Sequence, residues 1–146
     1  MTGTIAAHAA ENTEKVLQLI ETFVATANAG NPEAHARTFN FPHVLISNGS
    51  ASVWYTLEEL RSGYLPQLMA LRERGWARSV YDAKEIVQSD GSTFHVAVRF
   101  TRYDQQQTPL GTYDALYVVT CVNGHWGIQA RSNFVPPDAG GAASEG

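Results

Sequence analysis

His43, Tyr64 and Tyr117 are the side chains of this sequence that could together carry out a proton transfer. An imidazole titrates near neutral pH, which makes His43 the candidate general base. A tyrosine hydroxyl in an apolar pocket can donate a hydrogen bond to a ligand carbonyl and polarise it. The alternatives stay open, because no carboxylate is placed to orient His43 and the protein itself could satisfy each hydroxyl.

Asp114, Arg131 and Arg99 could bind a charged group, and two interpretations of them are open. In the first, Asp114 and Arg131 are neighbours on the polar outer face of a sheet and form an exposed or dimer-interface ion pair. In the second, the strand register slips by one residue and Arg131 points inward. It would then bind a carboxylate or another anionic ligand with its forked guanidinium. Arg99 has the same ambiguity.

The closing hairpin decides which residues share a face. Asn123-Gly124 is typical of a two-residue type I′ turn, which needs positive φ at both positions. A two-residue loop pairs Val119 with Ile128, and Tyr117 with Ala130. The apolar face of this hairpin then carries Tyr113, Tyr117, Trp126, Ile128 and Phe134, and the outer face carries Asp114, Gln129 and Arg131.

The pattern predicts an aromatic pocket for a small, largely apolar ligand. Ser132 could contact the ligand or accept the hydrogen bond of the Tyr117 hydroxyl. The other predicted pocket residues are Phe23, Trp54, Tyr64, Trp126 and Phe134.

Composition excludes several functional classes. The 146 residues fit one domain, and the net charge of -4, without a basic stripe, argues against nucleic acid as a partner. The single cysteine, Cys121, and the spacing of the histidines argue against a metal site, and no cofactor is indicated. No apolar stretch approaches the ~18 residues of a membrane span, and no signal peptide is evident, so we expect a cytoplasmic protein.

Three helices are predicted in the first half of the chain. Apolar residues at helical spacing favour a helix over residues 12–29, capped by Asn12 or Thr13. Asn31-Pro32 begins a short helix reaching about Phe39. Thr56 caps a third helix that runs towards residue 74, with a bend rather than a break at Pro66.

The strands follow two patterns. A small hairpin of residues 41–47 and 51–55 turns at Asn48-Gly49, and a long, bent or bulged strand covers residues 76–89. Three antiparallel strands then fill residues 92–134, the first with the alternating apolar face Phe94, Val96, Val98 and Phe100. We expect a flexible leader over residues 1–10 and a disordered tail over residues 136–146.

This order of elements resembles the nuclear transport factor 2-like superfamily over residues 11–135. The segments that carry the likeness are NAGNPEAHARTF after the first helix, TLEEL after the small hairpin, and the closing NGHWGIQARSNF. The chain looks most like the small SnoaL-like and ketosteroid-isomerase-like members. The resemblance implies an α+β fold in which a curved antiparallel sheet wraps around three helices as a cone, and often a homodimer through the outer sheet face.

The resemblance also locates the positions of a known active site. The tyrosine of the isomerases falls on Phe23, their base near Ile46 and their second acid on Val118 or Tyr117, so none of those three groups is retained. His43 lies close to the position of the base, and Tyr117 close to that of the oxyanion donor.

Two functions therefore remain as hypotheses. The first is an isomerase- or dehydratase-type enzyme that acts on a small apolar ligand, with His43 as base and Tyr64 or Tyr117 as donor. The second is a non-catalytic ligand-binding or dimerisation module.

Overall fold

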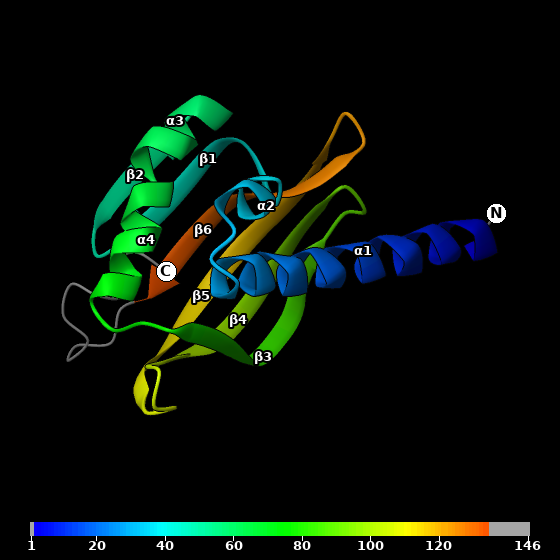
Figure 1. Cartoon of the computed structure of the whole chain (residues 1–146). Helices are drawn as coiled ribbons and strands as arrows, with labels where there is room; N and C mark the ends of the chain where they lie inside the picture. Colours follow the sequence, from blue (N-terminus) through cyan, green and yellow to red (C-terminus); the bar gives the residue numbers. More distant parts are fainter. Residues whose placement is uncertain (1, 135–146) are drawn as a thin grey trace.

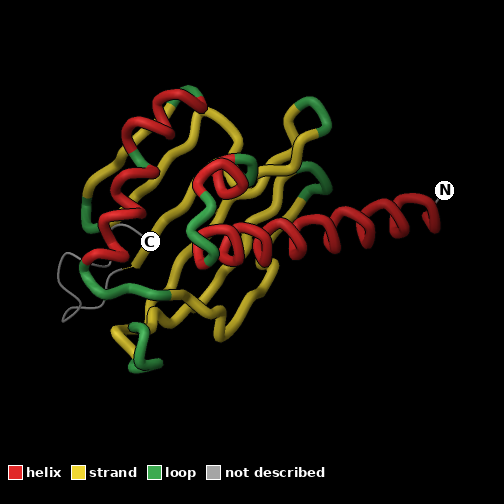
Figure 2. The backbone as a smooth tube through the Cα atoms, viewed as in Figure 1, coloured by secondary structure: helices red, strands yellow, loops and turns green. Residues whose placement is uncertain are grey.

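A computed structural model describes residues 2–134 of the chain (Figures 1 and 2). Residues 136–146, expected to be a disordered tail, lie outside the described residues. The elements are α1 (Thr2–Asn28), α2 (Pro32–Ala36), β1 (Phe39–Ser47), β2 (Ser50–Trp54), α3 (Leu57–Gly63), α4 (Leu65–Glu73), β3 (Arg78–Ser89), β4 (Thr93–Tyr103), β5 (Pro109–Val122) and β6 (His125–Phe134).

The strands form one six-stranded sheet in the order β2-β1-β6-β5-β4-β3. All neighbouring strands are antiparallel except β1 and β6, which run parallel and make the sheet mixed. The sheet is curved, and the helices lie on its concave face (Figure 1). The predicted α+β cone fold is confirmed, and the one parallel pair is a feature that the sequence pattern did not reveal.

Helix α1 packs on the sheet through Val16, Ile20, Phe23 and Ala27, which recur at helical spacing and are buried. It begins at Thr2, so the predicted start at residues 12–13 was wrong and residues 2–10, expected to be a leader, are helical. Asn12 does not cap the helix. Its side chain donates a hydrogen bond to the carbonyl of Gly91 at 2.9 Å and so ties α1 to the β3–β4 turn.

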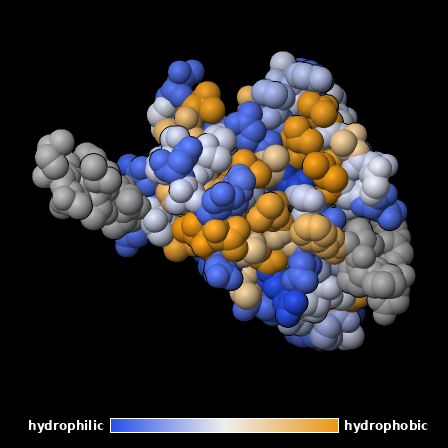
Figure 3. Space-filling model, turned by 180° about the vertical axis from the view of Figure 1, so that it is seen from behind, coloured by the Kyte–Doolittle hydropathy of each residue, from blue (hydrophilic) through white to orange (hydrophobic). Residues whose placement is uncertain are grey.

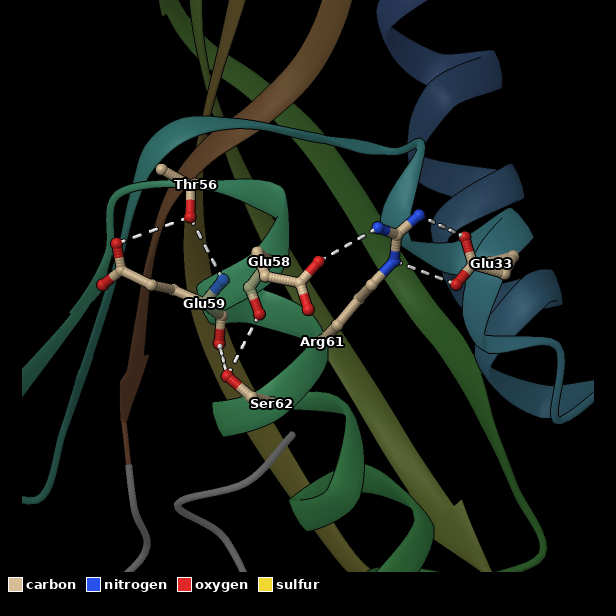
Figure 4. A network of polar contacts seen from close by, with 6 residues as sticks. All are labelled: Glu33, Thr56, Glu58, Glu59, Arg61 and Ser62. Carbon is tan, nitrogen blue, oxygen red and sulfur yellow. Dashed lines mark hydrogen bonds and ion pairs between the residues drawn. The ribbon is translucent and has the colours of Figure 1, made fainter.

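The predicted caps of the shorter helices are confirmed. Asn31 Oδ1 accepts a hydrogen bond from the backbone N–H of Ala34 at 3.2 Å at the start of α2. Thr56 Oγ1 accepts one from the N–H of Glu59 at 3.1 Å at the start of α3 (Figure 4). Helix α2 ends before Phe39, because Phe39 already pairs with Ile128 of β6.

The third predicted helix is divided into α3 and α4. Tyr64 joins them and keeps right-handed helical dihedral angles, with φ -93° and ψ -46°. Pro66 lacks the N–H that would bond the carbonyl of Ser62, and the interruption at Tyr64 lies between these two residues. Arg61 links α3 to α2 through two hydrogen bonds to Glu33, at 2.9 and 3.0 Å (Figure 4).

The closing hairpin has the predicted two-residue turn but not the predicted register. Val122 faces His125, and Asn123 and Gly124 have φ of 51° and 79°. A bulge then inserts Gln129, so that Val119 pairs with Ile128 but Val118 pairs with Ala130. From this point every residue of β6 is one position out of the predicted register.

Two hydrogen bonds of the Gln129 side chain hold the bulge. Its Oε1 accepts from the Thr120 hydroxyl at 2.7 Å, and its Nε2 donates to the carbonyl of Pro42 at 3.0 Å. The extra residue is thus anchored to β5 on one side and to β1 on the other. Because of the bulge, Arg131 pairs with Tyr117 and points into the cone, whereas the predicted register placed it on the outer face.

Candidate functional site

A cavity inside the cone lies between the helices and the sheet. Its walls include Phe23, Tyr64 and Tyr117, which the sequence predicted, together with Phe100 and Tyr81. It leaves about 20 Å³ for the centre of a water molecule. Because a molecule extends beyond the space that is open to the centre of a water, the cavity has room for a ligand of only a few heavy atoms. The remaining walls are Val24, Ala27, His35, Leu68, Leu71, Trp76, Ser79 and Arg102.

The guanidinium of Arg131 lies inside the cone, surrounded by aromatic rings. Arg131 has no exposed surface. Its central carbon is 5.3 Å from the ring centre of Phe23, 5.7 Å from that of Phe39 and 5.0 Å from that of Tyr64. The ring faces attract the positive charge, but they accept no in-plane hydrogen bonds from it.

The hydrogen bonds of this guanidinium are incomplete. Nε donates to Nε2 of His43 at 3.2 Å. Nη1 and Nη2 have no hydrogen-bond acceptor among the described residues. No aspartate or glutamate is among the buried side chains of residues 11–134, although Arg102 is a second buried cation there and lines the cavity. Among the described residues, Arg131 therefore has no buried carboxylate that balances its charge.

His43 has both ring nitrogens engaged. Nδ1 donates to the carbonyl of Ile128 at 2.9 Å, and Nε2 accepts from Arg131. Burial, together with the charge of Arg131, lowers the pKa of His43 to about 2. The ring is thus neutral, and it is not among the cavity walls. The structure places the predicted base behind Arg131 and not beside the cavity.

His35 of α2 lines the cavity and was not among the predicted site residues. Its Nδ1 is 3.0 Å from the hydroxyl of Thr26, and its Nε2 has no partner among the described residues. Burial and the charge of Arg131 lower the pKa of His35 to about 3. The spacing of the histidines indicates only whether they could share a metal ion, so no sequence signal identified His35.

Two tyrosine hydroxyls meet at the wall of the cavity. Tyr81 donates a hydrogen bond to the hydroxyl of Tyr117 at 3.3 Å, which leaves the hydrogen of Tyr117 available to a ligand. Burial raises the pKa of both tyrosines, so both hydroxyls stay protonated. Tyr81 was missed because β3 has bulges after Tyr81 and Ile86, which disrupt the alternation that would have assigned its face.

Several predicted pocket residues lie elsewhere. Trp54 is buried but packs against Tyr64 and His43, with ring centres 5.4 and 6.1 Å apart, and is not a cavity wall. Trp126 is half-buried against Phe94. Ser132 and Phe134 were predicted inside the cone, but the Gln129 bulge turns both to the outer face, where Phe134 is 58% exposed.

Asp114 pairs with Arg99 and not with Arg131. Arg99 Nε and Nη2 donate to the two carboxylate oxygens of Asp114 at 2.8 and 3.2 Å, and this ion pair lies on the outer sheet face. The guanidinium holds the pKa of the Asp114 carboxyl below its usual value. The predicted pair of Asp114 with Arg131 was therefore wrong, and the alternative with Arg131 inside is the one observed.

Within residues 11–134, no three His, Cys, Asp or Glu side chains are grouped so that they could hold a metal ion. None of the described helices is long and apolar enough to cross a membrane.

The sequence matches a known protein family. The family described as "NTF2-like protein (DUF6841)" matches residues 12–132. No curated protein matches the sequence.

Solved structures share the fold at low sequence identity. A cystatin-like protein of unknown function from Nostoc punctiforme is 19% identical, with a TM-score of 0.70, over 88% of this chain and 93% of that one. An NTF2-like protein from Novosphingobium aromaticivorans is 14% identical, with a TM-score of 0.73, over 96% and 91%. A putative ketosteroid isomerase from Shewanella frigidimarina is 13% identical, with a TM-score of 0.64, over 80% and 92%.

Proposed function

The chain belongs to the NTF2-like family DUF6841, and we propose that this member binds a small molecule in its cone without acid/base catalysis by His43. The observation that carries the proposal is the state of His43. Both of its ring nitrogens are hydrogen-bonded and its pKa is lowered to about 2, so it is a poor proton acceptor near neutral pH.

The other polar groups at the cavity favour binding over proton abstraction. Tyr117 and Tyr81 are donors whose pKa values are raised by burial, and His35 has its pKa lowered to about 3. An efficient general base has a pKa near the working pH, and the pKa of about 3 keeps His35, the histidine among the cavity walls, far from this condition. The Tyr81, Tyr117 and His35 side chains are thus suited to orient a ligand and not to deprotonate it.

A cavity-filling substitution tests the proposal. Ala27→Leu places a larger side chain in the wall of the cavity, and Ala83→Leu makes the same change on the outer face of β3. A panel of small neutral and anionic compounds is titrated into 15N-labelled protein and followed by NMR, with circular dichroism to confirm that each variant is folded. We expect binding that Ala27→Leu abolishes and Ala83→Leu retains.

The same samples test the non-catalytic part. Each binder is expected to be recovered unchanged after long incubation, as followed by its own 1H spectrum. Conversion of a binder by the wild type that is lost in Tyr117→Phe would contradict the proposal and restore the proton-transfer hypothesis.

We further propose a homodimer through the outer sheet face. Apolar side chains gather on this face (Figure 3), and Ile46, Val53 and Phe134 are 45%, 38% and 58% exposed there. Exposed apolar patches of this kind mark interaction sites. Sedimentation equilibrium is expected to give a dimer for the wild type and a monomer for Phe134→Glu, whereas a monomeric wild type would refute it.

A further inference from the structure

Arg131 is a buried cation whose two terminal nitrogens have no hydrogen-bond acceptor among the described residues. The residue has no exposed surface, and neither Nη1 nor Nη2 has an acceptor among residues 11–134. Buried charges are normally paired, and groups left unsatisfied call for a specific explanation. The bulge at Gln129 turns the residue inward, so its position follows from the backbone.

The unpaired group adjoins the cavity. Phe23 and Tyr64 lie against the guanidinium and also line the cavity, and Tyr117, its cross-strand partner in β5, is a third wall. Nη1 and Nη2 therefore lie next to residues that line the cavity, although Arg131 is not itself one of its walls. Tyr64 lies at the interrupted junction of α3 and α4, where the helix pair lacks a continuous set of hydrogen bonds.

A second unsatisfied group faces the same rings. The ring of His35 is 4.6 Å from that of Phe23, 5.2 Å from that of Phe39 and 6.3 Å from that of Tyr64, the three rings that surround Arg131. Its Nε2 has no partner among the described residues, and it is a donor or an acceptor according to the tautomer. Arg131 and His35 thus leave unmet hydrogen bonds on one aromatic cluster.

From this geometry we propose that the cone selects a short-chain carboxylate, held by Arg131 through Nη1 and Nη2. The inference rests on the proposed small-molecule binding and names its ligand class. A planar carboxylate matches the fork of a guanidinium with two parallel hydrogen bonds. The Tyr117 hydroxyl is a further donor, and His35 Nε2 donates in the tautomer that carries its hydrogen.

The alkyl part of the ligand lies in the apolar section of the cavity. Leu68, Leu71 and Phe100 line it, and its volume fits only a few heavy atoms. Acetate and butyrate are of this size. Because no carboxylate is buried among residues 11–134, a neutral molecule of the same shape leaves the charge of Arg131 unpaired.

Butyrate and butyramide are the matched probes, because they differ in charge and hardly in shape. NMR titrations of the wild type are expected to give binding of butyrate at least 10-fold tighter than that of butyramide, as charge-assisted hydrogen bonds to a buried group imply. Arg131→Met should remove this preference, and Arg99→Met, on the outer face, should leave it unchanged. Arg131→Lys keeps a charge but lacks the fork, and is expected to bind butyrate with intermediate affinity.

The outcomes separate the two proposals. Equal affinity of the wild type for both probes, or unchanged butyrate affinity in a folded Arg131→Met, overturns the carboxylate assignment. The wild-type comparison alone decides the point if Arg131→Met does not fold. If butyrate fails to bind but a neutral compound still binds in the cavity, the proposed function stands without this inference. If no compound binds in the cavity, both the proposed function and the carboxylate assignment are refuted.

Discussion

Arg131 on β6 and Arg99 on β4 belong to the same sheet but lie in opposite surroundings. Arg99 is on the outer face, where its side chain is 57% exposed and forms two hydrogen bonds with Asp114. Arg131 is inside the cone with no exposed surface, and no described carboxylate faces it. The charge that water could solvate is paired, whereas the charge that water cannot reach is not.

The difference indicates which of the two charges serves binding. An exposed ion pair contributes little, because water and salt weaken it. Burying a cation costs several kcal/mol, which a ligand's opposite charge can offset. The Gln129 bulge keeps Arg131 inside the cone despite this cost. The inner arginine is therefore the one we assign to a ligand.

Acidification is expected to have the largest effect, because it protonates His35 and His43 in the unfolded chain but not in the folded one. The folded chain holds the pKa of His35 at about 3 and that of His43 at about 2, whereas the ordinary value is 6.5. Below pH 6.5 the unfolded chain binds two protons that the folded chain does not, so each histidine lowers the free energy of unfolding by about 1.4 kcal/mol per pH unit. Urea unfolding at pH 7.5 and pH 5.0 should differ by about 4 kcal/mol from these two residues.

His43→Asn is the control for this titration. It removes one of the two groups and is expected to reduce the pH-dependent loss by about half. A stability that does not change between these pH values would mean that the interior histidines are not held neutral.

Removal of the inner charge is the next largest expected effect. Arg131→Met replaces a buried cation by an apolar side chain of similar length, and the free energy of unfolding should stay the same or rise, by up to about 4 kcal/mol. Chemical denaturation at pH 7.5 measures it. A loss above about 3 kcal/mol would instead identify Arg131 as a structural partner of His43, and the contrast with Arg99 would disappear.

Loosening the bulge tests why Arg131 points inward. Gln129→Ala removes the hydrogen bonds to Thr120 and Pro42, and a loss of about 1–2 kcal/mol in unfolding free energy is expected. Gln88→Ala, at an exposed position beside a bulge of β3, is the control and should have little effect. Equal stability of the two variants would show that the Gln129 contacts do not hold the bulge.

The outer pair gives the smallest expected effect. Arg99→Met should shift the thermal midpoint by less than about 3 °C, and added salt should reduce the difference. A larger shift in monomeric protein would mean that the outer pair contributes more than its exposure suggests.

Local signals accounted for most of the fold. The alternation of Phe94 to Phe100, the Asn123-Gly124 turn and the caps at Asn31 and Thr56 depend on residues close in sequence, and each is found as predicted. The predicted start of α1 was wrong because Asn12, which has the chemistry of a cap, bonds instead to the distant Gly91.

The site was harder to predict, because one non-local contact decides it. The bulge at Gln129 depends on the Pro42 carbonyl of another strand, and no short-range pattern reveals that contact. It turned Arg131 inward and moved Ser132 and Phe134 outward. Phe23, Tyr64 and Tyr117 were placed correctly at the cavity, since the first two lie on helical stripes and Tyr117 is fixed by the strand before the bulge. The catalytic roles of His43, Tyr64 and Tyr117 remain predictions.

A crystal structure of the protein grown in butyrate tests the central claim most directly. The account predicts a carboxylate inside the cone with one oxygen within about 3.2 Å of Arg131 Nη1 and the other equally close to Nη2. Butyrate bound only on the outer face near Arg99, with the terminal nitrogens of Arg131 bonded to protein groups, would contradict it.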